Sequence, residues 1–516
     1  MPDAVSTGLP RPTGVQPCRL DALAAAVSGR LYGPATAQLA VTGVSAASDR
    51  VRPGDLFAAV PGASVHGARF AADALAAGAV AVLTDPSGRG QLPEDAAVLE
   101  VDQVRAALGP ISAEVYGRPS SILDIVGVTG TSGKTTTAYL LRAGLTAAGR
   151  RTGLIGTVAT LVGEQRLTTG FTTPEAPELQ ALLAVMAERG VTSVAMEVSS
   201  HALGMHRADG IAFAVAGFTN LSQDHLDFHT DMDDYFAAKA RLFDGRSRRT
   251  VIVVDDEWGV RMAEVATRAA ALQPRTAEPV TVSAQDHPAD WTASDITDRA
   301  DGTTSFRVRG PGIELATGCA IPGRFNVANV LLALAMLHAV GVDVVVAAPA
   351  VARATVPGRM QRVEAGQPFL AVVDYSHKPA AVEGALAALR TLTRGRLIIV
   401  LGCGGDRDRA KRPLMGQVAA TGADLLVVTD DNPRSEDPAA IRRAMLAGAR
   451  NAPGRGEVIE VGDRRAAIDT AVAAATAGDI VLVAGKGHET GQEIGGAVLP
   501  FDDVQQLRAA IEAAAR

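Results

Sequence analysis

The sequence predicts an α/β fold built from parallel sheets. The first observation is a set of uninterrupted Val, Ile and Leu runs of strand length, which alternate with Ala-rich segments of helix length. Strands that are apolar throughout are typical of parallel sheets covered on both faces. The second observation is that several runs end in polar or glycine-rich residues. The predicted strands lie in residues 79–84, 122–130, 191–200, 251–256, 395–405, 423–432 and 479–487.

The length of the chain indicates several domains. A single core does not extend over 516 residues, and a prior of about 150 residues per domain suggests three. Breaks occur at "GRPSS" (117–121) and "ATVPGRM" (354–360), where Pro and Gly precede new strands. We therefore predict domains at residues 1–121, 122–355 and 356–516.

The composition excludes some classes of function. A formal net charge of -7, without a basic run, does not indicate a basic surface for binding nucleic acid. The three cysteines are far apart and form no C-x-x-C pair, which argues against a disulfide framework. No stretch of about 20 apolar residues predicts a membrane span, and no signal peptide is visible. We expect a cytoplasmic protein without membrane insertion, with a loose leader to about residue 17.

The strongest local signal is "GVTGTSGKTTT", residues 127–137. A strand leads into a glycine-rich turn whose amides can cradle phosphates, Lys134 follows to reach the terminal phosphates, and the Thr135 hydroxyl can bind Mg²⁺. The first glycine of the usual motif is replaced by Val128. The motif predicts nucleotide binding by Gly130, Thr131, Ser132, Gly133, Lys134, Thr135 and Thr136.

A second cluster is "MEVSSHALGMHR", residues 196–207, at the end of a predicted buried strand. Ligands bind at this edge of a parallel sheet. Glu197 can hold Mg²⁺ directly or through water. The alternative is a helix start capped by Ser199 or Ser200, and the local sequence does not separate the two.

The segment "FTNLSQDHLDFHTDMDDYFAAKARLF", residues 218–243, is rich in His and Asp. Zinc would fit the density of Asp224, His225, Asp227 and His229, but their spacing matches no tetrahedral template. Lys239 lies among aromatic and aliphatic residues. Taken alone, it is predicted on the solvated face of an amphipathic helix.

Three further segments carry polar residues with two interpretations each. Asn326 and Asn329 in "GRFNVAN" are either helix caps or partners of an adenine edge. "DYSHKP", residues 374–379, places Asp374, Tyr375 and His377 after an apolar strand. "VVTDDNPRSED", residues 427–437, is either a surface turn or a cradle for a charged group.

Together, in this order, the segments resemble the Mur ligases of peptidoglycan synthesis. The resemblance rests on "GTSGKTTT", "TTP", "MEVSSHAL", "FTNLSQDHLDFH", "YFAAKARLF", "GRFNVAN", "DYSHKP", "GCGGDRD", "DNPR" and "GKGHE". It covers nearly all of the chain beyond residue 40. It implies an N-terminal domain for the UDP substrate, a central P-loop ATPase-like parallel sheet and a C-terminal Rossmann-like domain for the amino acid.

The resemblance implies an ATP-dependent, ADP-forming ligase that makes an amide bond. The D-Glu carboxylate of UDP-N-acetylmuramoyl-L-alanyl-D-glutamate attacks the γ-phosphate, and an amine then displaces phosphate from the acyl phosphate. Such phosphoryl transfer needs positioning and charge neutralisation more than covalent chemistry by the protein. The catalytic residues implied are Lys134, Glu197, His225 and Lys239.

The resemblance also implies two Mg²⁺ sites. They fall on Thr135 with Glu197, and on His225 with Lys239 carbamylated by CO₂. Carbamylation turns a cation into an oxygen ligand, which reverses the local interpretation of Lys239. Asn326 is implied as the adenine contact.

For the UDP-muramyl dipeptide, the residues implied are Ser48, Thr172, Thr173, Ser199 and Arg207. Arg207 suits a carboxylate. Asp49 stands where relatives usually have Arg, and Met205 where they have Gln.

"DNPR" marks the members of this family that add meso-diaminopimelate. The implied set is Arg407, Asp431, Asn432, Pro433, Arg434, Gly485 and Glu489. Arg434 and Arg407 would pair with the far carboxylate, and Asn432 and Glu489 would take the ammonium. A site built for a charged group rejects an analogue that lacks it.

Other interpretations stay open. Related enzymes with another acceptor are the L-lysine-adding form, the next ligase of the pathway and folylpolyglutamate synthase. Intact "DNPR" argues against the first, and the N-terminal "RPGDLF" segment against the last. A nucleotide-binding scaffold without chemistry would lack Lys134, Glu197, His225 or Lys239, and all four are present.

Overall fold

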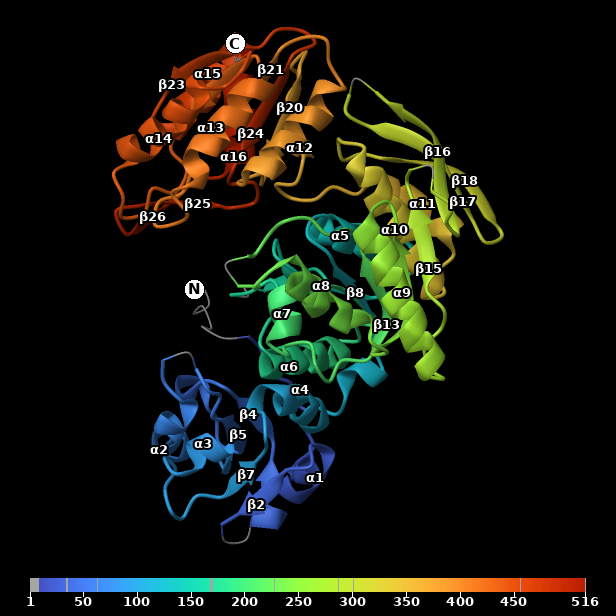
Figure 1. Cartoon of the computed structure of the whole chain (residues 1–516), viewed down its shortest axis with the longest axis vertical. Helices are drawn as coiled ribbons and strands as arrows, with labels where there is room; N and C mark the ends of the chain where they lie inside the picture. Colours follow the sequence, from blue (N-terminus) through green and yellow to red (C-terminus); the bar gives the residue numbers. More distant parts are fainter. Residues whose placement is uncertain are drawn as a thin grey trace. The chain divides into compact units, whose positions relative to one another are not determined.

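The computed structural model describes residues 9–33, 36–62, 64–167, 170–226, 228–285, 287–299, 301–454 and 456–515. The chain divides into two compact units, residues 1–292 with 331–348, and residues 293–330 with 349–516. Within the described ranges, no helix is long and apolar enough to cross a membrane. Figure 1 labels the helices and strands of both units.

The first unit begins with a small mixed sheet in the order β2-β7-β6-β5-β4. Only β2 runs antiparallel to its neighbour, and the other pairs are parallel. The strands are β2 (Arg30–Tyr32), β4 (Gly43–Ser45), β5 (Asp55–Ala58), β6 (Ala81–Thr84) and β7 (Val98–Glu100). The helices are α1 (Leu20–Ala26), α2 (Ala71–Ala76), α3 (Pro86–Arg89) and α4 (Val104–Val115), and β1 (Cys18–Arg19) pairs with β3 (Ala40–Val41).

The leader is held where the structure describes it. Arg11 donates to both carboxylate oxygens of Asp55, at 2.6 and 2.8 Å. The backbone N–H groups of Thr13 and Gly14 donate to Glu188, at 2.8 and 2.7 Å. The prediction of a loose leader to about residue 17 is therefore wrong for residues 11–14, while residues 1–8 lie outside the described part. Charge-assisted contacts to distant residues cannot be read from a Pro/Gly composition.

The large sheet of the first unit has the order β11-β10-β9-β12-β8-β13-β14-β15, and the first residues of β16 pair with β15. From β9 to β15 all neighbours are parallel. The strands are β8 (Asp124–Thr129), β9 (Thr152–Ile155), β10 (Thr160–Val162), β11 (Gln165–Leu167), β12 (Ser193–Glu197), β13 (Phe213–Phe218), β14 (Ser247–Val253), β15 (Val280–Ser283) and β16 (Trp291–Asp298).

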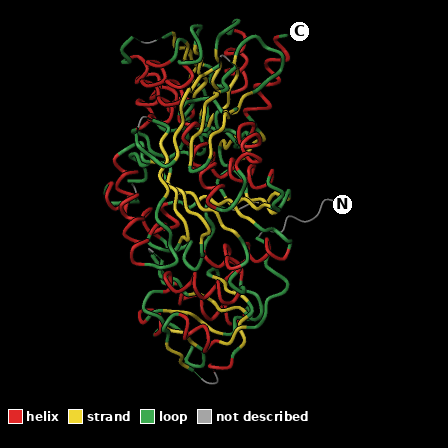
Figure 2. Tube along the Cα trace, turned by 90° about the vertical axis from the view of Figure 1, so that its right-hand side faces the viewer, coloured by secondary structure: helices red, strands yellow, loops and turns green. Residues whose placement is uncertain are grey.

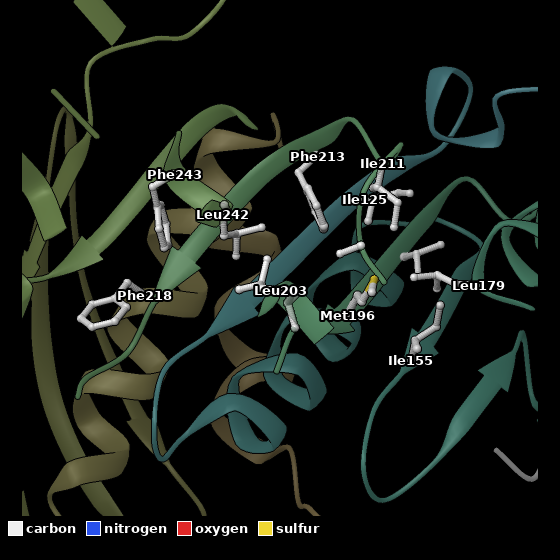
Figure 3. Packing of buried hydrophobic residues seen from close by; sticks show 14 of the residues in the cluster. Ile125, Ile155, Leu179, Met196, Leu203, Ile211, Phe213, Phe218, Leu242 and Phe243 are labelled. Carbon is white, nitrogen blue, oxygen red and sulfur yellow. The ribbon is translucent and has the colours of Figure 1, made fainter. Parts of the chain in front are cut away.

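Helices flank this sheet, as Figure 2 shows with strands in yellow and helices in red. They are α5 (Lys134–Ala147), α6 (Ala176–Glu188), α7 (Ser200–Gly204), α8 (Met232–Ala240) and α9 (Glu257–Leu272), together with the parts of α10 (Phe325–Ala339) and α11 (Val344–Arg353) that belong to this unit. Side chains from α6 and α7 pack against β8, β12 and β13 in one buried cluster (Figure 3). The predicted buried strands are confirmed here.

The second unit holds a six-stranded sheet in the order β19-β20-β24-β21-β22-β23, in which only β19 is antiparallel. Its strands are β19 (Gln361–Arg362), β20 (Leu370–Asp374), β21 (Leu397–Leu401), β22 (Leu425–Val428), β23 (Glu457–Glu460) and β24 (Ile480–Ala484). Two hairpins, β17 (Thr304–Gly310) with β18 (Ile313–Cys319) and β25 (Gly491–Ile494) with β26 (Ala497–Pro500), complete the strands described in this unit.

The connections of the second sheet change direction once. From β21 to β23 the chain moves outward through α13 (Lys411–Gly422) and α14 (Pro438–Arg450), then returns through α15 (Arg464–Ala474) to the central strand β24. Because parallel crossovers are right-handed, the returning helix lies on the opposite face from α12 (Pro379–Arg390), α13 and α14. Helix α16 (Asp503–Ala514) packs beside α15. This doubly wound arrangement directs ligands to the carboxyl ends of the strands.

Candidate functional site

The glycine loop of the first unit joins β8 to α5. Gly130 and Gly133 have φ of 148° and 88°, a left-handed region that favours glycine. A Cβ atom at Gly130 would lie 1.8 Å from Thr219 Oγ1. The Lys134 ammonium folds back over the loop and donates to the carbonyls of Gly130 and Thr131, both at 2.8 Å. The predicted strand, loop and helix are all present, with Lys134 and Thr135 in the first turn of the helix.

The residues after β13 fasten this loop. Thr131 N–H donates to the Asn220 carbonyl at 2.9 Å, and Ser132 N–H donates to Asn220 Oδ1 at 3.1 Å. The Thr219 hydroxyl donates to the Ser132 carbonyl at 2.7 Å. Thr219 and Asn220 are functional candidates that the sequence reasoning missed. Their signal was their place directly after an apolar strand, the position that drew attention to Glu197.

Glu197 ends β12 and its residue is only 1% exposed. Its carboxylate accepts from the Thr135 hydroxyl at 2.9 Å, and from the Thr157 N–H and hydroxyl at 2.8 and 3.2 Å. These donors compensate the cost of burying a charge. Thr157 is a third residue that the sequence reasoning missed, since no motif marks it.

The donor set at Thr135 and Glu197 fits a hard cation. Mg²⁺ takes oxygen ligands, and it is usually bound through one or two carboxylates, substrate phosphates and several waters. A hydroxyl and a carboxylate that are already in contact supply two such oxygens beside a phosphate loop. Among the described residues, no group of three or more His, Cys, Asp or Glu is placed to hold a metal by itself.

Lys239 is buried, at 1% exposure, on α8. Its ammonium donates to the Gly130 carbonyl at 2.8 Å and lies 4.4 Å from the centroid of the Tyr235 ring. Burial lowers the pKa of Lys239 well below its usual value, the nearby Lys134 lowers it further, and Asp224 opposes both. The interpretation of Lys239 as a lysine on a solvated helix face is therefore wrong.

His225 lies in the same region in a left-handed conformation, with φ of 54°. Its ring centroid is 6.1 Å from that of Tyr235 and 4.7 Å from that of His201. The Tyr235 ring therefore lies near both His225 and Lys239. Asp227, considered above as a zinc ligand, lies outside the described residues.

Four residues expected at the muramyl dipeptide lie close to Glu197 or near one another. The Thr173 hydroxyl donates to the Glu197 carbonyl at 2.9 Å. The hydroxyls of Thr172 and Thr157 are 2.9 Å apart. Ser199 caps α7 by accepting from the Ala202 N–H at 3.1 Å, so the cap interpretation of this serine is confirmed.

Arg207 is the fourth of these residues. Its guanidinium pairs with Glu175 at 2.9 Å, donates to the Thr173 carbonyl at 3.3 Å and lies 4.5 Å from the Phe171 ring centroid. The Arg207 Nε atom is buried and has no hydrogen-bond partner among the described residues. Ser48 begins a short 3-10 helix in the small sheet's loop region, and no described contact joins it to the residues above.

In the second unit, Asn326 is the second residue of α10 and is 1% exposed. It donates to the Pro322 carbonyl at 2.8 Å and accepts from the Asn329 amide at 2.9 Å. The helix position predicted for both asparagines is confirmed. The Asn326 amide stabilises the start of the helix by donating to the carbonyl of Pro322, four residues earlier in the chain. It does not act as an N-cap, which would accept a hydrogen bond from a helix N–H group.

The predicted amino-acid residues follow the carboxyl ends of β21, β22 and β24. Gly485, directly after β24, has φ of 112°, and a Cβ atom there would lie 2.6 Å from Asp431 Oδ2. A Cβ at Gly405 would lie 1.9 Å from the Pro433 carbonyl oxygen. These close approaches require glycine and hold the 431–434 turn against the two neighbouring loops.

Asn432 is the centre of this arrangement. Its amide Nδ2 donates to Glu489 Oε2 at 2.8 Å. Its Oδ1 accepts from Lys486 Nζ at 2.9 Å and from the Glu493 N–H at 3.0 Å. The amide oxygen is therefore already satisfied, and what Asn432 offers to a ligand is an N–H donor.

Arg434 also has a left-handed backbone, with φ of 55°. Its Nε donates to Glu493 Oε2 at 3.0 Å and its Nη1 to the Gly405 carbonyl at 2.7 Å. Within the described residues, Nη2 makes no hydrogen bond. Arg407 is exposed and is not drawn into these contacts. Lys486 and Glu493 were missed: Lys486 stood unremarked inside "GKGHE", and nothing in the local sequence marks Glu493.

Comparisons with known proteins agree with this arrangement. Family models match in three parts: "Mur ligase family, catalytic domain" at residues 40–116, "Mur ligase middle domain" at 128–337 and "Mur ligase, glutamate ligase domain" at 358–487. Together they cover most of the chain.

Curated relatives match over nearly the full length. The UDP-N-acetylmuramoyl-L-alanyl-D-glutamate--2,6-diaminopimelate ligase of Streptomyces avermitilis is 52% identical over 514 residues, 98% of each chain. The protein of the same name from Corynebacterium glutamicum is 51% identical over 468 residues, 88% of this chain and 89% of the relative. A solved structure of a ligase with this name superposes with a TM-score of 0.72 at 32% identity, over 97% of this chain and 100% of the other. The chain therefore belongs to the Mur ligase family.

Proposed function

We propose that this chain adds meso-diaminopimelate to UDP-N-acetylmuramoyl-L-alanyl-D-glutamate, with ATP converted to ADP and phosphate. Members of the family are ATP-dependent ligases that form amide bonds, and the relatives named above carry this substrate in their names. The single observation that carries the proposal is the turn at Asn432 to Arg434. It presents an amide donor in contact with the Glu489 carboxylate, and a guanidinium two residues later that bonds to Glu493 and Gly405. A ligand with a carboxylate and an ammonium at one end requires such groups of both signs.

The first step assigned to the glycine loop is phosphoryl transfer. The N–H groups of the loop and the Lys134 ammonium hold the ATP phosphates while a substrate carboxylate oxygen attacks the γ-phosphorus and ADP leaves. The ATP set is Gly130, Thr131, Ser132, Gly133, Lys134, Thr135 and Thr136, with Asn326 as the adenine candidate. In the proposal, the Lys134 ammonium exchanges its contacts with the Gly130 and Thr131 carbonyls for contacts with the ATP phosphates.

In the second step, the amine of diaminopimelate attacks the acyl phosphate carbon. A tetrahedral intermediate forms, phosphate leaves with the bonding electron pair, and the ammonium that results loses a proton to give the amide. Positioning of the two reactants supplies most of the rate. The residues assigned to the muramyl dipeptide are Ser48, Thr172, Thr173, Ser199 and Arg207, with the unpartnered Arg207 Nε available to a carboxylate.

Mg²⁺ is part of the proposal. When bound, it would neutralise phosphate charge. Thr135 and Glu197 would hold one ion, and His225 with a carbamylated Lys239 the other. The state of Lys239 supports carbamylation, since burial and a neighbouring cation favour the neutral amine, which is the form that attacks CO₂ and then loses a proton.

The amino-acid site divides into two halves. We assign the distal carboxylate of diaminopimelate to Arg434 and to the Asn432 N–H, and the distal ammonium to Glu489. The engaged Oδ1 of Asn432 favours this division over the expectation that Asn432 takes the ammonium. Asp431, Pro433 and Gly485 shape the turn, and Arg407 would have to move to reach the ligand.

Two further expectations belong to the proposal. The division into domains 1–121, 122–355 and 356–516 assigns one substrate to each part. The reaction is placed in the cytoplasm, where ATP and nucleotide-linked precursors are made.

The experiment is a phosphate-release assay with the purified chain, ATP, Mg²⁺, UDP-muramyl dipeptide and one amino acid at a time, followed by mass spectrometry of the product. We expect release only with all substrates present, and a product heavier by one diaminopimelate residue. ATP binding without phosphate release in any mixture would favour the nucleotide-binding scaffold. A product containing L-lysine or glutamate would favour the related ligases.

A further inference from the structure

Lys486 is a fully buried cation directly behind the proposed amino-acid site. It follows β24 in the loop 485–489, and its residue is 0% exposed. Its ammonium donates to Asn432 Oδ1 at 2.9 Å and to Glu489 Oε2 at 3.2 Å. A buried ammonium is costly unless it is paired and hydrogen-bonded. Here both partners are residues that the proposed function assigns to diaminopimelate.

The contact with Lys486 fixes the direction of the Asn432 amide. The Oδ1 atom meets two donors, the Lys486 ammonium and the Glu493 N–H. If the amide were reversed, its NH₂ group would face both donors, and the Oδ1 atom would face the Glu489 carboxylate. Both sides of the amide would then lose their hydrogen bonds. Lys486 therefore holds the amide so that its N–H groups point toward the carboxylate of Glu489 and the ligand side.

Lys486 also fixes Glu489. The Lys486 ammonium and the Asn432 amide donate to the same oxygen, Oε2. The other carboxylate oxygen, Oε1, has no hydrogen bond among the described residues, and the Glu489 side chain is 34% exposed. One oxygen is thus anchored and the other is left for a ligand ammonium.

A second buried cation nearby contacts other partners. Arg464 pairs with Asp503 through two hydrogen bonds at 2.8 and 2.7 Å, and donates to the Ala484 carbonyl at 2.9 Å. None of these partners is a proposed ligand contact, so Arg464 braces the fold around β24. Lys486 differs because its two side-chain partners are both in the site.

We propose that Lys486 is a positioning residue for diaminopimelate: it orients the Asn432 amide and one oxygen of Glu489 without touching the ligand. This inference rests on the proposed function. It predicts that loss of the ammonium weakens binding of diaminopimelate while leaving the ATP and muramyl dipeptide sites intact.

The test is steady-state kinetics of Lys486→Met, which keeps the length of the side chain and removes its charge and donors. We expect the KM for diaminopimelate to rise about ten- to hundred-fold, as for loss of hydrogen bonds to a charged group. The KM values for ATP and for the muramyl dipeptide should change less than about twofold. Arg443→Met is the control, because it removes an exposed cation of the same unit whose ion pair with Asp437 is worth little.

A double-mutant cycle separates positioning from general support of the fold. If Lys486 acts partly through Asn432, then Lys486→Met should raise the KM for diaminopimelate by a smaller factor in an Asn432→Ala background than in the unsubstituted chain, because only the contact with Glu489 is then left to lose. If the KM of the double variant for diaminopimelate rises by the product of the two single-variant factors, the residues act independently and the proposal is overturned. A parallel rise in the KM for ATP also overturns it.

Lys486→Gln provides a second route if the methionine variant does not fold. Its NH₂ group keeps two N–H donors but no charge, so we expect a rise of about three- to tenfold in the KM for diaminopimelate. Unchanged KM in a folded Lys486→Gln variant, as judged by circular dichroism, overturns the proposal. The unsubstituted chain runs in the same assay: if it fails to use diaminopimelate, the proposed function fails, whereas a competent chain with a silent Lys486 variant refutes the positioning role alone.

Discussion

Two buried lysines show how the same side chain is used in two ways within one chain. Lys239 in the first unit has a backbone carbonyl as its hydrogen-bond acceptor and the Lys134 ammonium as its electrostatic neighbour. Lys486 in the second unit has an amide oxygen and a carboxylate. Both residues are almost completely buried.

The difference lies in what compensates the buried charge. Burial beside another cation favours the neutral amine, which is a nucleophile, and this is why the pKa of Lys239 is lowered. Lys486 lies beside a carboxylate and an amide oxygen, and it donates to both. The environment of a lysine, rather than its burial alone, decides whether it supplies chemistry or holds its neighbours in place.

The largest expected effect is the fall in activity when Lys239 is replaced. Lys239→Ala removes the amine that would carry the carbamate, and with it an oxygen ligand near the phosphates. We expect kcat to fall at least about 10³-fold, which corresponds to roughly 4 kcal/mol. The measurement is phosphate release at saturating substrates. Partial recovery with formate or acetate supports the carbamate role, and full activity of the variant in the absence of added carboxylate refutes it.

The next effect concerns Arg464, another buried cation of the second unit. Asp503→Ala leaves the Arg464 guanidinium buried without its carboxylate, so the free energy of unfolding of this unit should fall by about 3 kcal/mol. Urea unfolding followed by circular dichroism measures the loss.

The adjacent Asp502→Ala is a matched control for Asp503→Ala. It removes only the N-cap of α16, where Asp502 accepts from the N–H groups of Val504 and Gln505, at a cost of about 1 kcal/mol. Equal losses in the two variants would mean that the Arg464 pair adds nothing beyond a helix cap.

A smaller effect is expected when Arg434 in the 431–434 turn is replaced. Arg434→Lys keeps the charge but loses the planar fork, so the KM for diaminopimelate should rise about ten- to thirtyfold while the KM for ATP stays within about twofold. Arg443→Lys, at an exposed position of α14, serves as the control. Comparable rises in both KM values for Arg434→Lys would indicate damage to the fold instead.

The smallest expected effect is a pH dependence of the stability of the fold, caused by Glu436 near this turn. Arg412 and the Asp406 N–H bond to Glu436 and lower its pKa from 4.5 to about 2. A carboxylate with a lowered folded-state pKa stabilises the fold above about pH 4.5, and this contribution is lost as the pH falls toward about 2. Glu436→Gln should therefore be less stable than the unsubstituted chain at pH 7, and the difference should shrink as the pH falls from about 4.5 through about 2. Thermal unfolding across this range measures it, with the exposed Glu512→Gln as control, and a difference that stays constant from pH 7 down to about 2 contradicts the prediction.

Much of the fold could be predicted because apolar runs bury themselves on both faces of a sheet. Each of the seven predicted runs overlaps a strand, although β14 begins four residues before its run, and the glycine loop joins β8 to α5 as predicted. Lys239 could not be placed from its local sequence, because its burial depends on the Gly130 loop, which is 109 residues away in the chain.

The contacts of Asn432 show a similar limit. Its partners Lys486 and Glu493 come from a loop and a hairpin that only the fold brings beside the 431–434 turn. The local sequence indicated turn chemistry for Asp431 to Pro433, and the structure adds which atom of Asn432 remains for a ligand. That atom cannot be assigned without the distant donors.

The central claim is that the turn from Asn432 to Arg434 selects the far end of diaminopimelate. Its most direct test is the ratio of kcat/KM for meso-diaminopimelate to that for L-lysine in the unsubstituted chain. Because L-lysine lacks the distal carboxylate and would leave Arg434 without its partner, the account predicts a ratio of at least about 10³. Equal or greater kcat/KM with L-lysine would contradict it.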